Sequence, residues 1–372
     1  MHVLVIFTYG YSLKTWKESG TLDKELSLYV ELSEKYNLKF TFLSYGKKED
    51  IQLIKNYKNF SVIPIYEIIK QSNNRFIRYI KSFLIPFKVS KLIKEDIDLI
   101  KHNQLNGSWV AIILKTLITK KVYIRTGYDM YLFSKHDKKS KLIQYLYKVL
   151  TKFTLKFCDF YTVSSKADYE FLTQNFKNTE KIKIRPNSIK LCSNTEEPRR
   201  FSDKILCVGR LESQKNFSFI IKEFEKTNIQ IDFVGDGSEK NSLLKLAKKH
   251  QVKINFLGTF DNKELLSLFS KYKYFVNPSL YEGNPKTVIE AMSKGCIVFV
   301  SNIKNHNELV THKQEGFVFE LEKHSLKNLF EKHFDENTDL ISRNAIDKIK
   351  SLYDIEIAAK NEFYDYEDMI KL

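Results

Sequence analysis

Short apolar runs rich in β-branched and aromatic residues alternate along this chain with longer segments of helical periodicity. In the first half the runs fall at 2–7, 39–44, 61–66, 97–102, 121–126, 159–164 and 181–186. Amphipathic segments such as 22–36 and 141–157 lie between them. Continuous apolar strands separated by helices favour a parallel, doubly wound α/β sheet.

The alternation begins again near residue 203, with further runs at 204–209, 230–235, 253–258, 274–278, 296–301 and 316–320. The polar connector 189–203 is the natural boundary. We therefore expect two Rossmann-like, doubly wound parallel-sheet domains, 1–190 and 203–350, which face each other across a cleft where ligands bind. The helical segment 351–372 is expected to close the fold, possibly by crossing back onto the first domain.

Several other classes of protein are disfavoured. The apolar runs are shorter than the roughly 18 residues that a membrane-spanning helix needs, and the start reads as a buried strand, not a signal peptide. The cysteines at 158, 192, 207 and 296 show no CxxC pattern. They are expected to be reduced core thiols of a cytosolic protein. The histidines lack metal-ligand spacing, so neither a metal site nor a bound cofactor is predicted.

The excess of positive charge is confined to the first half. Residues 1–190 carry 34 Lys+Arg against 17 Asp+Glu, and residues 191–372 carry 27 against 28, within a net charge of +16. The segment 75–94 mixes basic and bulky apolar residues without an acid, and 141–157 repeats the theme. This pattern favours an anionic membrane surface as partner. The alternative is a solvated lysine-rich surface over core aromatics.

Two cations follow the first strand of the second half in VGRLESQKN, residues 208–216. Arg210 and Lys215 come just after Gly209, where both can point at one anionic group such as a diphosphate. Alone, the pair also fits a solvated turn ahead of a helix. The glycine-rich turn VGDGSEK at 234–240 follows a second strand. By itself it is a weak signal that indicates only where a ligand could bind.

The stretch YEGNPKTVIE, residues 281–290, predicts a loop that enters a helix near Lys286 or Thr287, with Pro285 in its first turn. The amides of such a helix start form an anion site. Glu282 would lie in the loop over a ligand, and Glu290 about one turn into the helix, within reach of a ribose diol. The alternative is that Glu282 is only a turn residue and that Glu290 lies at the edge of the core.

Together these stretches resemble family 4 of the retaining glycosyltransferases, which have the GT-B fold. The match covers 208–216, 233–240, 256–260, 277–302 and 308–320, in the family's order. The resemblance implies that Arg210 and Lys215 bind the donor diphosphate, that Glu282 contacts the donor sugar, and that Glu290 binds the nucleotide ribose. It also implies that the backbone of Gly283, Asn284, Pro285, Lys286 and Thr287 holds sugar and phosphate, and that Leu257 and Gly258 border the base.

The first domain resembles the family less closely. The family's amino-terminal glycine loop corresponds in this chain to Gly10 between Tyr9 and Tyr11, whereas a double glycine is more usual in the family. Where the family often carries a histidine near the donor sugar, this chain offers Tyr128, a poorer base because a tyrosine pKa is about 10. Arg125, Tyr128 and Asp129 are therefore candidate acceptor-side residues without assigned roles.

The resulting prediction is a retaining hexosyltransferase that moves a sugar from a nucleotide-diphosphate donor to a glycan or lipid-linked saccharide in cell-surface polysaccharide or lipopolysaccharide synthesis. It would work in the cytoplasm, peripheral at the inner face of the membrane, and without metal. The motif Asp96-Ile97-Asp98 mimics a metal-binding DxD but lies at the start of a strand, away from the ligand edge. Alternatives are an epimerase or phosphorylase of the same fold, and less readily a nucleic-acid-binding protein.

Overall fold

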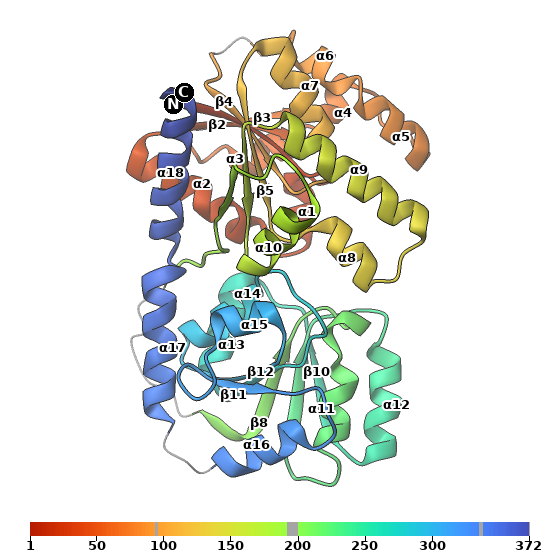
Figure 1. Ribbon diagram of the computed structural model, residues 1–372, viewed down its shortest axis with the longest axis vertical. Helices are drawn as coiled ribbons and strands as arrows, with labels where there is room; N and C mark the ends of the chain where they lie inside the picture. The colour runs from red at the N-terminus through yellow and green to blue at the C-terminus, as the bar shows by residue number, and fades with distance from the viewer. Residues whose placement is uncertain (94–95, 192–199, 335–337, 372) are drawn as a thin grey trace. The chain divides into compact units, whose positions relative to one another are not determined.

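The computed structural model describes residues 1–93, 96–191, 200–334 and 338–371 (Figure 1). Lys94, Cys192 and most of the predicted connector lie outside the described residues. The chain forms two compact units. One comprises Met1–Pro186 together with Ile355–Leu372, and the other comprises Asn187–Asp354.

The first unit is built on a seven-stranded sheet with the order β3-β2-β1-β4-β5-β6-β7, in which every neighbouring pair is parallel. Its strands are β1 His2–Ile6, β2 Lys39–Ser44, β3 Phe60–Pro64, β4 Leu99–Asn103, β5 Lys121–Thr126, β6 Phe160–Val163 and β7 Ile182–Ile184. Its helices are α1 Leu13–Glu18, α2 Leu22–Tyr36, α3 Glu49–Ile54, α4 Ile65–Ile68, α5 Arg75–Ser82, α6 Ile85–Val89, α7 Ser108–Ile118, α8 Met130–His136, α9 Lys141–Phe157, α10 Lys166–Asn175 and α18 Ile355–Lys371.

The second unit has a six-stranded sheet with the order β10-β9-β8-β11-β12-β13, also parallel throughout. Its strands are β8 Phe201–Val208, β9 Gln230–Val234, β10 Lys253–Gly258, β11 Tyr272–Asn277, β12 Ile297–Ser301 and β13 Phe317–Phe319. Its helices are η1 Ser213–Lys215, α11 Phe217–Glu223, α12 Lys240–His250, α13 Asn262–Ser270, α14 Lys286–Ser293, α15 Lys304–Leu309, α16 Ser325–His333 and α17 Asp339–Leu352. The predicted α/β class with two parallel sheets is confirmed.

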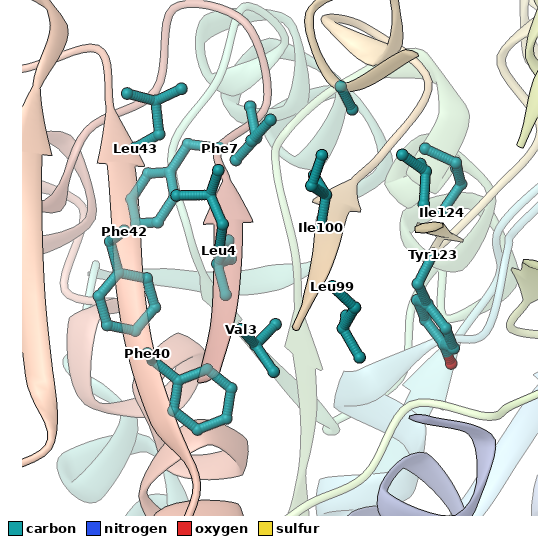
Figure 2. Close-up of a cluster of buried hydrophobic side chains, with 14 of the residues drawn as sticks. Val3, Leu4, Phe7, Phe40, Phe42, Leu43, Leu99, Ile100, Tyr123 and Ile124 are labelled. Atoms are coloured by element: carbon teal, nitrogen blue, oxygen red, sulfur yellow. The ribbon is translucent and has the colours of Figure 1, made fainter. Parts of the chain in front are cut away.

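The core of the first unit explains why its strands read as continuous apolar runs. Figure 2 shows side chains from β1, β2, β4 and β5 packed together, among them Val3, Phe42, Ile100 and Tyr123. All five residues of β1 are buried, because helices cover both faces of a parallel sheet. Burying each large apolar side chain contributes about 1.5–3 kcal/mol.

One predicted strand ends earlier than expected, and the structure gives the secondary structure of the basic segment, which the sequence had left open. The run 61–66 leaves the sheet at Pro64, because Ile65 begins α4 and the Tyr66 amide donates to Gly46 O at 3.1 Å. The basic segment 75–94 forms two short helices, α5 and α6, in its described part. Asn74 caps α5 by accepting hydrogen bonds from two amides of its first turn.

The C-terminal helix α18 packs against α2 within the first unit (Figure 1). Phe363 stacks on Tyr36 with ring centroids 4.3 Å apart. Lys101 of β4 forms a buried ion pair with Glu362, and Arg185 donates to Asp365 Oδ1 at 2.6 Å. The last residues of the chain therefore complete the unit that its first residues begin.

Candidate functional site

The carboxyl ends of the parallel strands in the second unit share one edge of its sheet. Gly209 follows β8, Gly235 follows β9 and Gly258 ends β10. The Gly209 amide donates to Val234 O at 2.9 Å, and the Gly235 amide donates to Gly258 O at 2.8 Å. A Cβ on Gly235 would lie 2.0 Å from Gly209 O, so only glycine permits this close approach.

Lys215 ends the short turn after β8, and its side chain crosses Gly209. A Cβ on Gly209 would lie 2.9 Å from Lys215 Cε, so the missing side chain leaves the space through which the lysine passes. The Lys215 Nζ donates to Glu282 Oε1, and both side chains are largely buried. The structure thus brings together one cation and one carboxylate that the sequence placed in different motifs.

A network of polar side chains orients Glu282. Ser279 Oγ lies 2.7 Å from Glu282 Oε1 and 2.5 Å from Asn277 Oδ1. Burial by itself would raise the pKa of Glu282, but Lys215 and the Ser279 hydroxyl outweigh burial and lower it. Glu282 is therefore a buried, ionised carboxylate at neutral pH.

Beneath this network lies His306, which no sequence signal indicated. The Ser301 hydroxyl donates to Ser279 O at 2.6 Å, and His306 Nδ1 lies 2.9 Å from Ser301 O. Burial lowers the pKa of His306 to about 4, so the ring is neutral at pH 7. Ser279 lies three residues before Glu282 in the sequence. This closeness to a predicted site residue is the signal that could have pointed to Ser279.

Arg210 differs from Lys215 because its side chain is exposed. Its nearest polar partner is Gln214 Oε1, at 3.5 Å, and among the described residues it forms no ion pair. Gln214 Nε2 donates to Tyr281 O at 2.9 Å, and Gln214 O accepts from the Leu280 amide at 2.9 Å. The turn that carries both cations is thereby fixed to the loop that carries Glu282.

The loop between the two glutamates is held by Asn187. Asn284 Oδ1 accepts from the Asn187 amide at 3.1 Å, and Asn187 Nδ2 donates to Asn284 O at 2.8 Å. Helix α14 begins at Lys286, as expected, while Pro285 stands at the N-cap and not inside the first turn.

Within α14, Thr287 Oγ1 is buried and has no hydrogen-bond partner among the described residues, and Glu290 is buried one turn beyond Lys286. The helix start therefore presents its first amides and a buried hydroxyl at the same sheet edge. A negatively charged ligand is the chemical match for these donors. Leu257 and Gly258 lie at the end of β10, and a Cβ on Gly258 would meet no atom within 4 Å.

The four remaining predicted residues, Gly10, Arg125, Tyr128 and Asp129, belong to the first unit. Gly10 has a φ of +84° and is exposed. Arg125 Nη1 donates to Arg185 O at 2.9 Å, which ties β5 to the end of β7. Tyr128 packs on Phe133 with ring centroids 4.6 Å apart.

Asp129 caps α8, where its side chain accepts from the Leu132 amide at 2.6 Å. Burial raises the pKa of Asp129 to about 6. Its second carboxylate oxygen is buried without a hydrogen-bond partner in the described part of the chain. The geometry of Arg125 and Asp129 gives both residues structural contacts, and their acceptor-side roles stay a prediction.

The Asp96-Ile97-Asp98 motif lies just before β4, at the amino end of that strand. Asp96 pairs with Lys120 at 3.1 Å, and Asp98 accepts from the His2 amide at 2.7 Å. Within the described ranges, no group of three His, Cys, Asp or Glu side chains is placed to hold a metal ion. None of the described helices is both long and apolar enough to cross a bilayer.

Comparisons with known proteins agree on one family. The family model described as glycosyl transferases group 1 matches residues 195–349. An uncharacterized glycosyltransferase of Methanocaldococcus jannaschii is 27% identical over 259 residues, which cover 63% of each chain. The chain thus spans less than two thirds of that relative's length.

A second relative, from Escherichia coli, is named UDP-Gal:alpha-D-GlcNAc-diphosphoundecaprenol alpha-1,3-galactosyltransferase. It is 26% identical over 317 residues, covering 76% of this chain and 81% of the relative. The solved structure of a sucrose-phosphate synthase from Thermosynechococcus elongatus superposes with a TM-score of 0.78 at 16% identity and covers all of both chains. Residues 195–349 are therefore similar to the group 1 glycosyltransferases, and the chain has the GT-B-like fold of the solved structure.

Proposed function

We propose that this glycosyltransferase moves a hexose from a UDP-sugar to a lipid-linked saccharide in cell-surface polysaccharide synthesis. The observation that carries the proposal is the Lys215–Glu282 pair, which lies beside Gly209 at the sheet edge where helix α14 begins. The E. coli relative's name supplies the donor and acceptor classes.

Arg210 and Lys215 would neutralise the donor diphosphate in different ways. Arg210 is exposed and forms no ion pair with an acidic side chain among the described residues. Its guanidinium can therefore donate two parallel hydrogen bonds to one phosphate without first breaking an ion pair. Lys215 is already bound to Glu282, so a phosphate oxygen would share its ammonium with that carboxylate. The amides and hydroxyl at the start of α14 add further donors.

The remaining assignments follow the family motif. Glu290 would bind the ribose, and Leu257 with Gly258 would border the base. Glu282 would face the donor sugar, where an ionised carboxylate favours the positive charge that develops at the anomeric carbon. The backbone of residues 283–287 would hold the sugar and the phosphate.

In the proposed transfer the bond between the anomeric carbon and the diphosphate oxygen breaks, and a bond to the acceptor hydroxyl forms on the same face. The acceptor's proton passes to the leaving phosphate oxygen, so no second carboxylate acts as a base. Arg210, Lys215 and the positive end of α14 stabilise the departing charge. The cations thus take the part that a metal ion has in metal-dependent transferases.

We further propose that the first unit lies against an anionic membrane surface on the cytoplasmic side. Its α5–α6 segment exposes Phe76, Ile77, Ile80, Phe83, Leu84 and Phe87 beside the basic residues Arg75, Lys88 and Lys91. Helix α9 exposes Leu142, Ile143, Tyr145, Leu146 and Val149 among lysines. Apolar side chains flanked by cations match the interface of an anionic bilayer.

A screen of UDP-, GDP-, ADP- and CMP-sugars by thermal shift and by donor hydrolysis tests the proposal. We expect UDP-sugars to raise the melting temperature, and Arg210→Ala and Glu290→Ala to abolish that shift. Lys263→Ala, which removes an exposed lysine of the same unit, serves as the control. A full-length protein that responds to no nucleotide sugar would contradict the proposed function.

A further inference from the structure

We infer that His306 is a positioning residue, which holds the carboxylate of Glu282 in place through two serine hydroxyls. The inference rests on the proposed function, because Glu282 is the group proposed to face the donor sugar. His306 lies in α15, which follows β12, and Glu282 lies in the loop that follows β11. These strands are parallel neighbours, so their carboxyl ends are adjacent. No step of the proposed transfer uses the ring itself.

The proton on the histidine ring can be located from its neighbours. His306 Nδ1 lies 2.9 Å from Ser301 O, and a carbonyl oxygen only accepts hydrogen bonds, so Nδ1 carries a proton. Burial lowers the pKa of His306 to about 4, so at neutral pH this is the only proton on the ring nitrogens. Nε2 is then an acceptor, and it is buried without a hydrogen-bond partner among the described residues.

The proton on Nδ1 sets the direction of the Ser301 hydroxyl. Ser301 Oγ lies 3.1 Å from His306 Nδ1 and 2.6 Å from Ser279 O. Because a hydroxyl has one proton and Ser279 O can only accept, Ser301 donates to Ser279 and accepts from the ring. With Nδ1 protonated, the hydroxyl cannot turn its proton toward the ring. The histidine therefore fixes the end of β12 to the loop that follows β11.

Ser279 connects this arrangement to Glu282. Ser279 Oγ lies 2.7 Å from Glu282 Oε1, the oxygen to which Lys215 also donates. His306, Ser301 and Ser279 are all 0% exposed, so bulk water cannot replace a bond that is lost between them. A fully buried ring also cannot touch a ligand, so its effect on the donor sugar passes through Glu282.

The unpartnered nitrogen indicates that the ring does more than fill space. A buried polar atom without a hydrogen bond costs free energy, and an apolar side chain of similar size would avoid that cost. The donor at His306 Nδ1 is what such a side chain could not supply. We therefore assign the ring the task of orienting the serine hydroxyls.

Substitutions that move the donor test the inference in the full-length protein. His306→Asn places an amide nitrogen near the position of Nδ1, His306→Gln places it near that of Nε2, and His306→Leu removes it. His333→Leu is the control, because His333 is another buried histidine of the same unit, at the end of α16. The measurements are UDP binding, the hydrolysis of UDP-galactose and of UDP-glucose, and urea unfolding.

We expect His306→Gln and His306→Leu to hydrolyse the better of the two UDP-sugars about 10- to 100-fold more slowly, because a small displacement of a group at the reacting centre has an effect of this size. Their affinity for UDP, which lacks the sugar, should equal that of wild type. His306→Asn should keep most of the wild-type kcat even if it unfolds at a lower urea concentration. A purely structural histidine would instead make kcat follow stability in all three variants.

The second member of the chain provides an independent check. Ser301→Ala should reproduce the loss of kcat, and Ser301→Ala/His306→Leu should lose no more than either single variant, because both remove the same connection. Additive losses, an unchanged kcat in His306→Leu, or an equal loss in His333→Leu would overturn the inference.

Nitrogen-15 NMR of the histidine rings tests the chain of hydrogen bonds without any donor. We expect the wild type at pH 7 to show a neutral ring with its proton on Nδ1, and the loss of that signal in His306→Asn to assign it. A proton on Nε2 would overturn the inference. A wild type that binds neither UDP nor a UDP-sugar would contradict the proposed function, and the NMR result would still decide whether the ring orients Ser301.

Discussion

Lys215 Nζ donates a hydrogen bond to Glu282 Oε1, although the two residues lie 67 positions apart in the chain. The lysine comes from the turn after β8, and the glutamate comes from the loop after β11. These strands are neighbours in the sheet, so their carboxyl ends are adjacent. The contact joins a residue that was predicted to bind phosphate to a residue that was predicted to contact the sugar, so the charge of each affects the other.

Removing the lysine should cost both activity and stability. In Lys215→Ala the carboxylate of Glu282 stays buried without its cation, so we expect a loss of unfolding free energy of about 2–4 kcal/mol. We expect kcat to fall by about 10²–10³-fold, because the leaving diphosphate loses a charged donor. Urea unfolding and initial rates measure the two effects. A variant with normal stability and normal kcat would show that the pair has no such role.

The same pair should govern the response to acid. The pKa of Glu282 is lowered, so its stabilising contribution is present above the unfolded value of about 4.3 and is lost as pH falls below it. Without Lys215, burial would raise that pKa above 4.3, and Lys215→Ala should recover stability as pH falls from 7 to 5. Melting temperatures across pH 4–8 check that the stability of wild type and that of Lys215→Ala change with pH in opposite directions. Glu282→Gln has no titrating carboxylate at this position and should show neither change.

Asp129 should destabilise the protein at neutral pH. Burial raises its pKa to about 6, so ionisation above pH 6 opposes folding, and stability returns as pH falls toward 4. Asp129→Asn keeps a helix cap without the charge and should add on the order of 2 kcal/mol at pH 7.5. The gain should vanish near pH 4. Asp261→Asn, at the exposed cap of α13, controls for the change of cap residue.

The buried ion pair between Lys101 and Glu362 should attach α18 to the first unit. The two side chains are 1% and 4% exposed, so Lys101→Met leaves a buried carboxylate without its cation and should cost about 3–5 kcal/mol. The double variant Lys101→Met/Glu362→Gln should recover part of the loss, because no charge is then left buried at this position. If denaturant unfolding shows the double variant to be the sum of the singles, the two residues are not coupled.

Membrane binding should depend on the basic residues of the α5–α6 segment. We expect the protein to float with anionic vesicles and Arg75→Glu/Lys88→Glu/Lys91→Glu to sediment, because three attractive charges become repulsive. These residues do not line the pocket beside Tyr9, Tyr45 and Tyr66. Lys55→Glu/Lys58→Glu/Lys177→Glu, which changes three other exposed lysines of the unit, should still float. Equal flotation of both triple variants would argue against a specific membrane-facing surface.

The sequence by itself determined the alternation of strands and helices in this protein. Strand and helix periodicity are local, so the helices 22–36 and 141–157 could be predicted to the residue, and the start of α14 to within one residue, as Lys286 or Thr287. The motif spacing likewise placed Arg210, Lys215 and Glu282 after strands of one domain, and Glu290 in the helix that follows Glu282.

Only the tertiary structure decided which of those residues meet. The order of strands brings Lys215 to Glu282, and Ser301 and His306 beneath them. It also groups Tyr9, Tyr45 and Tyr66 around one pocket. These residues come from different strand ends, and their spacing in the sequence carries no record of the sheet order. The electrostatic environment, the burial and the hydrogen-bond partners of a residue depend on its neighbours in space. The chemistry of the site could therefore be described only from the tertiary structure.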